Sequence, residues 1–131
     1  MVERVCIGSG VLWEEQFGYS RAVRVQDRIY VSGTTATGPD GVVFRGDVAG
    51  QANYVIEKIE AAIKSLGGVL ADTVRTRVFV CRVEDSEIVG RIHHEHFKTI
   101  RPANTLVRAD LVGDDYLVEI EAEAVVGSAS E

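Results

Sequence analysis

Apolar and polar residues alternate over residues 101–126, and this pattern predicts two strands joined by a turn. The alternating runs cover 104–111 and 116–126, and the polar segment 112–115 between them is typical of a hairpin turn. Because successive strand side chains point to opposite sides, the second strand has one apolar and one acidic face. The apolar face carries Val118, Ile120, Ala122, Ala124 and Val126, and the acidic face carries Glu119, Glu121 and Glu123.

The first of these two strands is expected to place Thr105, Val107, Ala109 and Leu111 on its apolar side. Pairing across the short turn then puts Asn104, Leu106 and Arg108 on the face that continues the row of glutamates. Arg108 is the expected neighbour of those glutamates. A solvated sheet face with cross-strand charge pairs explains this arrangement in structural terms alone.

Two segments follow the 3.6-residue period of an amphipathic helix. The first begins after a cap at Asp47, ends at Gly67-Gly68, and has apolar residues at Val48, Ala52, Val55, Ile56, Ile59, Ala62, Ile63 and Leu66. The second begins at a cap, Ser86, and runs to about residue 100, where Pro102 ends it. Its inward residues are expected to be Ile88, Val89, Ile92 and Phe97.

Shorter strand patterns fill most of the remaining chain. Residues 21–25 and 28–31 predict a hairpin that leads into Ser32 and Gly33, residues 38–41 predict a turn, and residues 72–80 predict another strand. In that strand both arginines, Arg75 and Arg77, share the polar side with Phe79, and residues 1–20 are expected to form an edge segment or loop. The order of elements predicts an α+β fold with a mixed sheet and both helices on one face.

Composition narrows the class of protein. The 131 residues are 46% hydrophobic and 26% charged, which predicts one domain over residues 1–131. A net charge of -6 without a run of Lys or Arg argues against nucleic-acid and anionic-membrane partners. No segment approaches the ~18 apolar residues of a membrane span or resembles a signal peptide. Since Cys6 and Cys81 form no disulfide framework, a cytoplasmic protein is expected.

Neither a metal nor a nucleotide cofactor is expected. The three histidines, His93, His94 and His96, lie beside Glu95 in the second helix. His93 and His96 have a chelating i, i+3 spacing, but the third ligand would have to come from elsewhere, and an exposed helix flank explains the group equally well. Gly8-Ser9-Gly10 lacks the third glycine of a dinucleotide-binding loop, and Cys81 is interpreted as a packing residue.

Glu119 is the remaining candidate for chemistry. A carboxylate on a sheet face can orient a water molecule and exchange its proton, and backbone amides near Ser32 and Gly33 could hold an anion. Arg108 is expected diagonal to Glu119 across the hairpin. The residue pattern by itself indicates no substrate.

Several sequence motifs resemble the Rid family, also called YjgF, whose best-studied members are reactive intermediate deaminases. They are GYSRAVRV, YVSGTTATGPDG, GDVAGQA, RTRVFV, RPANTLV and LVEIEAEAV, and together they span nearly the whole chain. The resemblance implies a chorismate-mutase-like α+β fold with a six-stranded sheet. It also implies a barrel-shaped homotrimer with three ligand clefts between subunits. In the deaminating branch these clefts hydrolyse amino-acid-derived imines and enamines without a cofactor.

The resemblance also suggests site residues. Tyr19, Ser32, Gly33 and Glu119 match positions of the family's cleft, with Glu119 orienting the attacking water. The deaminating branch has a carboxylate-binding arginine where this chain has Asn104, and often a cysteine where it has Leu106. Asparagine lacks the charge and the two-pronged geometry of a guanidinium, so weak activity on carboxylate-bearing imines is expected.

Three functions from different classes are consistent with this pattern. A divergent deaminase or hydrolase would act on an imine or carbonyl compound other than the usual amino-acid imines. A metabolite-binding or regulatory protein would use the same cleft without turnover. A ribonuclease or translation inhibitor would fit older names for the family, although the acidic charge disfavours it.

Overall fold

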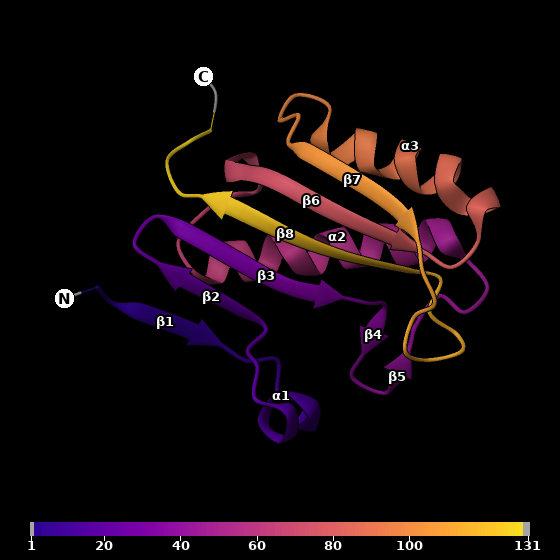
Figure 1. The fold of residues 1–131 in the computed structure, drawn as a ribbon, viewed down its shortest axis with the longest axis horizontal. Coiled ribbons are helices and arrows are strands. Elements are labelled where there is room, and N and C mark those ends of the chain that lie inside the picture. Colours follow the sequence, from indigo (N-terminus) through magenta and orange to yellow (C-terminus); the bar gives the residue numbers. More distant parts are fainter. Residues whose placement is uncertain (1, 130–131) are drawn as a thin grey trace.

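A six-stranded mixed sheet forms the centre of the molecule, with two long helices on one of its faces (Figure 1). The computed structural model describes residues 2–129. The strand order is β1-β2-β3-β8-β6-β7, and β6 and β7 are the one parallel pair in it. The strands are β1 (Arg4–Ile7), β2 (Ala22–Val25), β3 (Arg28–Thr34), β6 (Thr73–Val80), β7 (Ala103–Arg108) and β8 (Val118–Val125). The predicted α+β class and six-stranded mixed sheet are therefore confirmed.

Helix α2 (Val48–Ser65) forms where the 3.6-residue period predicts it. The Asp47 side chain accepts a hydrogen bond from the backbone N–H of Gly50 at 2.9 Å and caps the helix as expected. Gly67 follows the last turn with a φ of 91°, a conformation that glycine adopts at little cost. The predicted apolar stripe is buried throughout, at Val48, Ala52, Val55, Ile56, Ile59, Ala62, Ile63 and Leu66.

Helix α3 (Ser86–Phe97) differs from its prediction in two details. Asp85, not Ser86, occupies the capping position, and the Asp85 carboxylate binds the Arg82 guanidinium at 3.0 Å instead of a backbone N–H. Val89 is buried as expected, whereas Ile88 is 43% exposed. Adjacent residues of a helix lie about 100° apart around its axis, so Ile88 falls outside the narrow buried stripe.

The predicted hairpin over residues 104–126 is wrong. β7 pairs in parallel with β6, while β3 and β6 occupy the two edges of β8. Helix α3 connects β6 to β7, and such a strand–helix–strand crossover returns the second strand parallel to the first. Residues 109–117 then pass the end of β6 before β8 begins.

The predicted orientation of β7 is also wrong. Asn104 and Leu106 lie in register with Thr76 and Val78, whose side chains are buried beneath the helices. Nδ2 of Asn104 donates to Oγ1 of Thr76 at 2.9 Å, and Arg108 continues the same alternation, away from the glutamates. β7 is an edge strand exposed along most of its length, so hydrophobic alternation does not fix which of its sides faces the helices.

The N-terminal segment contains more regular structure than its sequence indicates. β1 is an edge strand, and helix α1 (Leu12–Phe17) follows it and ends at Gly18 with a φ of 75°. Trp13 and Phe17 are largely exposed, so this six-residue helix has no buried apolar stripe for the sequence to reveal. Its buried residue is Glu14, whose carboxylate accepts hydrogen bonds from the backbone N–H and the hydroxyl of Ser9.

Short elements complete the chain. The predicted turn at 38–41 joins β4 (Thr37–Gly38) to β5 (Gly41–Val42), and single 3-10 turns form at η1 (Leu70–Asp72) and η2 (Val83–Asp85). Within residues 2–129, no helix has the length and apolar character needed to cross a membrane.

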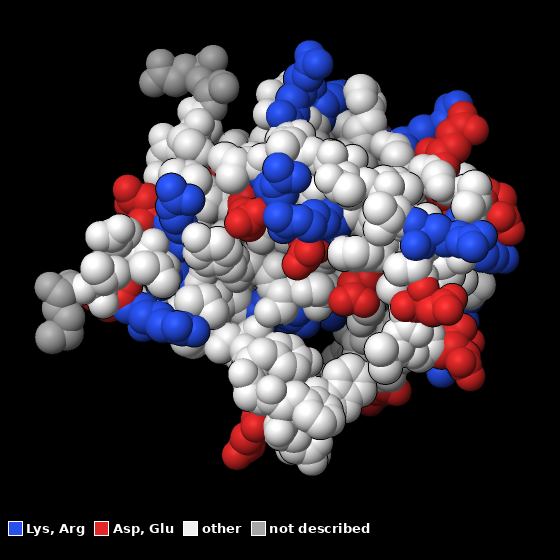
Figure 2. All heavy atoms as spheres, viewed as in Figure 1, with Lys and Arg blue, Asp and Glu red and all other residues white. Residues whose placement is uncertain are grey.

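The sheet face opposite the helices combines ion pairs with apolar side chains. Arg77 lies 3.4 Å from Glu123 and 3.8 Å from Glu121, and Figure 2 shows basic and acidic groups interleaved on this face. Phe79 and Val107 lie in register with Glu119 on the same side of the sheet. The glutamate row and the arginines of β6 thus lie on this face as the sequence predicts. The apolar residue that β7 contributes to this face is Val107, not the predicted Leu106.

Candidate functional site

A cavity of about 800 Å³ opens where β3 ends, between α1, the loop after β3, α2 and β8. Figure 2 shows the surface hollowed beside the lobe that α1 forms. A volume of this size falls within the range of small-molecule sites. The polar side chains that line the cavity belong to Ser9, Tyr19, Arg21, Thr35, Thr37, Tyr54, Lys58, Tyr116 and Glu119, and Gly33 lies among them.

A bulge in β3 places Gly33 against the carboxylate of Glu119. The register between β3 and β8 shifts between Val31 and Thr34, which leaves Ser32 and Gly33 outside the regular ladder. A Cβ at Gly33 would overlap Oε2 of Glu119, so the absence of a side chain permits this close approach. The structure therefore brings together Gly33 and Glu119, two of the residues that the sequence analysis proposes for the site.

The surroundings of Glu119 favour its protonated form. Burial raises the pKa of the Glu119 carboxyl, the positive charge of Arg21 opposes that rise, and the negative charge of Glu121 adds to it. A carboxyl with a raised pKa exchanges protons with water closer to neutral pH than an ordinary glutamate does. Such groups in cavities are frequent participants in catalysis.

Arg21 is a residue of the cavity that the sequence interpretation missed. Its Nη2 donates a hydrogen bond to the backbone oxygen of Gly33 at 2.5 Å. Burial lowers the pKa of the Arg21 guanidinium, and the neighbouring Glu14, Tyr19 and Glu119 oppose this effect. The signal was available, because Arg21 lies two residues after Tyr19 in the GYSRAVRV motif, directly before a strand.

Lys58 brings a second cation from α2. Its Nζ donates to the backbone oxygens of Thr35 at 3.1 Å and Thr37 at 2.9 Å. Burial lowers the pKa of the Lys58 ammonium, and the positive charge of Arg21 lowers it further. The Tyr116 hydroxyl lies 2.6 Å from Oγ1 of Thr37 and adds a polar group to the same wall.

The other predicted site residues are divided between two parts of the molecule. Tyr19 lines the cavity, and the Ser32 hydroxyl donates to the backbone oxygen of Ser20 at 2.7 Å, which holds the segment before β2. Asn104, Leu106 and Arg108 do not line the cavity, because β6 separates β7 from β8. One protomer therefore does not bring the β7 residues to Glu119.

The histidines of α3 make contacts inside the fold. Nε2 of His93 lies 2.8 Å from Oγ1 of Thr76, and Nε2 of His96 lies 2.8 Å from Oδ1 of Asn53. Burial lowers the pKa of the His93 imidazole, and the nearby His96 lowers it further. Over the described residues 2–129, no three His, Cys, Asp or Glu side chains are arranged to share a metal ion.

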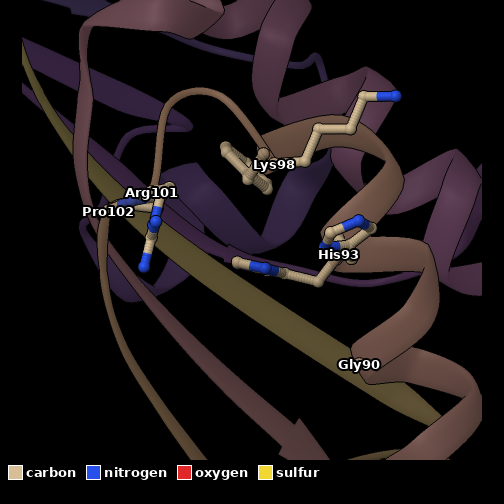
Figure 3. A pocket seen from close by; sticks show the side chains of 7 residues that line it. Gly90, His93, Lys98, Arg101 and Pro102 are labelled. Carbon is tan, nitrogen blue, oxygen red and sulfur yellow. The ribbon is translucent and has the colours of Figure 1, made fainter.

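A second cavity, of about 400 Å³, lies where α3 ends and β7 begins (Figure 3). His93, Arg101 and Pro102 line it, and Figure 3 shows the Lys98 side chain extending away from Arg101. Arg101 has a φ of 53°, so the chain turns sharply here before entering β7. This cavity contains no carboxylate and is separate from the one around Glu119.

Comparison with known proteins relates this geometry to a family. Residues 14–126 match the family described as endoribonuclease L-PSP. A crystal structure of a YjgF family member from Mycobacterium tuberculosis is 38% identical, with a TM-score of 0.86, and covers 95% of this chain and 100% of that one. A Rid family protein from Yersinia pestis is 27% identical, with a TM-score of 0.82, and covers 95% of this chain and 100% of its own.

A relative with a named activity is also similar over most of its length. The 3-aminoacrylate deaminase RutC of Acinetobacter baylyi is 32% identical over 109 residues, which are 82% of this chain and 86% of that protein. The matched region includes most of the chain, and the six-stranded sheet with its two covering helices agrees with the structural neighbours. The chain therefore belongs to the endoribonuclease L-PSP family, which is the YjgF or Rid family.

Proposed function

We propose that this protein hydrolyses small imines or enamines without a cofactor, with Glu119 as the residue that activates water. The observation that carries the proposal is the half-buried carboxylate of Glu119, held against Gly33 in a cavity of about 800 Å³. A carboxyl so placed can take a proton from water and return it to a leaving nitrogen. The deaminase name of the Acinetobacter relative supports this chemistry.

In the proposed reaction the Glu119 carboxyl group carries two protons in turn, each from an oxygen atom to the nitrogen atom. The water oxygen bonds to the imine carbon while Glu119 accepts a water proton, and the C=N π electrons move to nitrogen. Glu119 returns the proton to nitrogen and gives a carbinolamine. Glu119 then takes the hydroxyl proton and passes it to the amino group. The C–N bond breaks as the C=O bond forms, so ammonia leaves and a carbonyl product remains.

Wild-type protein should release ammonia from a freshly generated small imine about 10²- to 10⁴-fold faster than buffer at the same pH, the range that general acid–base catalysis provides. Stopped-flow loss of imine absorbance, with ammonia measured enzymatically, tests this. Heat-unfolded protein is the control. Binding of the carbonyl product without any turnover would instead support the metabolite-binding alternative. RNA cleavage is disfavoured by the net charge of -6.

We also propose that the ligand clefts lie between the subunits of a homotrimer, as the family resemblance implies. The open sheet face carries Phe79 and Val107 among half-exposed ion pairs, a mixture typical of subunit interfaces. Within one chain β6 separates Asn104, Leu106 and Arg108 from Glu119, so these predicted residues would contact the ligand only where the edge strand β7 meets the cavity of a neighbouring subunit.

Sedimentation velocity at micromolar concentration should give a single species of three times the 14.3 kDa chain mass. Burial of the open sheet face in a closed, symmetric assembly is the physical reason. Val107→Lys should shift the protein toward monomer, because it would place a charge in the interface, whereas Val83→Lys at an exposed position in η2 should not. A stable wild-type monomer would contradict the trimer.

A further inference from the structure

Two cations converge on the cavity of an otherwise acidic protein. Arg21 and Lys58 both line it, and each is at least partly removed from water. Glu119 is the one carboxylate among the lining residues, so two cations face a single acidic group. The cavity is therefore locally positive, although the whole chain carries a net charge of -6.

Both cations retain hydrogen-bond donors for a ligand. An arginine has five N–H groups, and among residues 2–129 the Arg21 guanidinium hydrogen-bonds through Nη2, to Gly33, which leaves the N–H groups of Nη1 for a ligand. The ammonium of Lys58 has three N–H groups and uses two of them for backbone oxygens, which leaves one.

Arg21 and Glu119 share the cavity without forming an ion pair. The charge of each group affects the pKa of the other. Within the described part of the chain, however, no salt bridge of 4.0 Å or less joins Arg21 to Glu119. Both groups instead contact Gly33, Arg21 at its backbone oxygen and Glu119 at the site of the missing Cβ. A small molecule can therefore contact the guanidinium at one end and the carboxyl at the other.

We infer that Arg21, assisted by Lys58, forms an anion subsite that binds the carboxylate of the substrate and presents the imine carbon to Glu119. This inference rests on the proposed function for the role of Glu119. It assigns carboxylate binding to Arg21, which directly precedes β2 in the same protomer as Glu119. The family's carboxylate-binding arginine would instead occupy the position of Asn104 in β7. Carboxylate-bearing imines are then substrates despite Asn104, contrary to the expectation from sequence.

The test compares two imines that differ in charge, one made from 2-oxobutanoate and one from its neutral amide, 2-oxobutanamide. Arg21→Gln should lower the ratio of their kcat/KM values, carboxylate over amide, by about ten- to hundredfold, the effect of one lost charged hydrogen bond. Arg21→Lys should restore part of the ratio because it keeps the charge without the planar fork. The matched control is Arg28→Gln, an exposed arginine outside the cavity, which should not change the ratio.

A binding measurement separates this inference from the proposed reaction. Isothermal titration with 2-oxobutanoate should show binding to wild type and to Glu119→Gln, and at least tenfold weaker binding to Arg21→Gln. If wild type binds 2-oxobutanoate through Arg21 but hydrolyses neither imine, the proposed reaction fails and the anion subsite stands. If Arg21→Gln changes neither the kcat/KM ratio nor the binding of 2-oxobutanoate, the anion subsite is wrong.

Discussion

Glu119→Gln should lower kcat for imine hydrolysis by about 10²- to 10⁴-fold, the usual contribution of a positioned acid–base group. Glutamine keeps the size of the side chain and its place beside Gly33, but it neither accepts nor donates the transferred proton. KM should change much less than kcat, because the binding contacts to Arg21 and Lys58 remain. Steady-state ammonia release at saturating substrate measures kcat directly.

The matched control is Glu123→Gln, which changes a glutamate of the same strand and the same face. Glu123 forms ion pairs with Arg75 and Arg77 outside the cavity, so its replacement should leave kcat within a factor of about three, as expected for half-exposed pairs. Retention of more than a tenth of wild-type kcat by Glu119→Gln would remove Glu119 from the proposed mechanism.

The pH dependence of wild type gives a second test of the same role. Burial raises the pKa of Glu119, with Arg21 opposing and Glu121 adding to the rise. As pH falls, the Glu119 carboxylate should therefore become protonated, and be lost as a base, at a pH higher than the usual glutamate pKa of about 4.3. The rate for an imine of fixed charge should therefore fall as pH decreases through this raised pKa. Glu119→Gln should lack that acidic limb, whereas a limb in both proteins would assign it to another group.

Gly33→Ala should lower kcat by about 100-fold, which is the scale of a 1 Å misplacement of a catalytic group. The added Cβ would overlap Oε2 of Glu119, so the carboxylate must leave its position or β3 must shift at the bulge. The same change also disturbs the backbone oxygen that holds Arg21. Steady-state kinetics, with circular dichroism to confirm folding, measures the loss.

Gly90→Ala is the matched control for this substitution. Gly90 lies in α3, and nothing lies within 4 Å of a Cβ placed there. Alanine in a helix is favoured over glycine by roughly 0.5–1 kcal/mol, so this variant should be slightly more stable in urea unfolding and equally active. Full activity of Gly33→Ala would show that the close approach of Glu119 to the backbone is not needed for the reaction.

The sequence by itself determined the elements whose patterns are local. The 3.6-residue stripe and the Asp47 cap specify α2, and the strict alternation of β8 separates its buried alanines from Glu119 and the other glutamates. These predictions succeed because one side of each element is buried along its whole length, so apolar residues recur with the period of that element. The family resemblance likewise identified Gly33 and Glu119, which lie together in the structure.

Tertiary structure decided the features that depend on which strands meet. The crossover through α3 makes β7 a parallel edge strand and orients Asn104 toward Thr76 instead of Glu119. Both sides of an exposed edge strand contact water, so its hydrophobic pattern does not predict this orientation. Gly33 lies at the bulge of β3 and contacts both Arg21, which precedes β2, and Glu119, which belongs to the distant strand β8. Contacts of this kind arise from chain topology, which no local period encodes, and they determine the charge of the cavity.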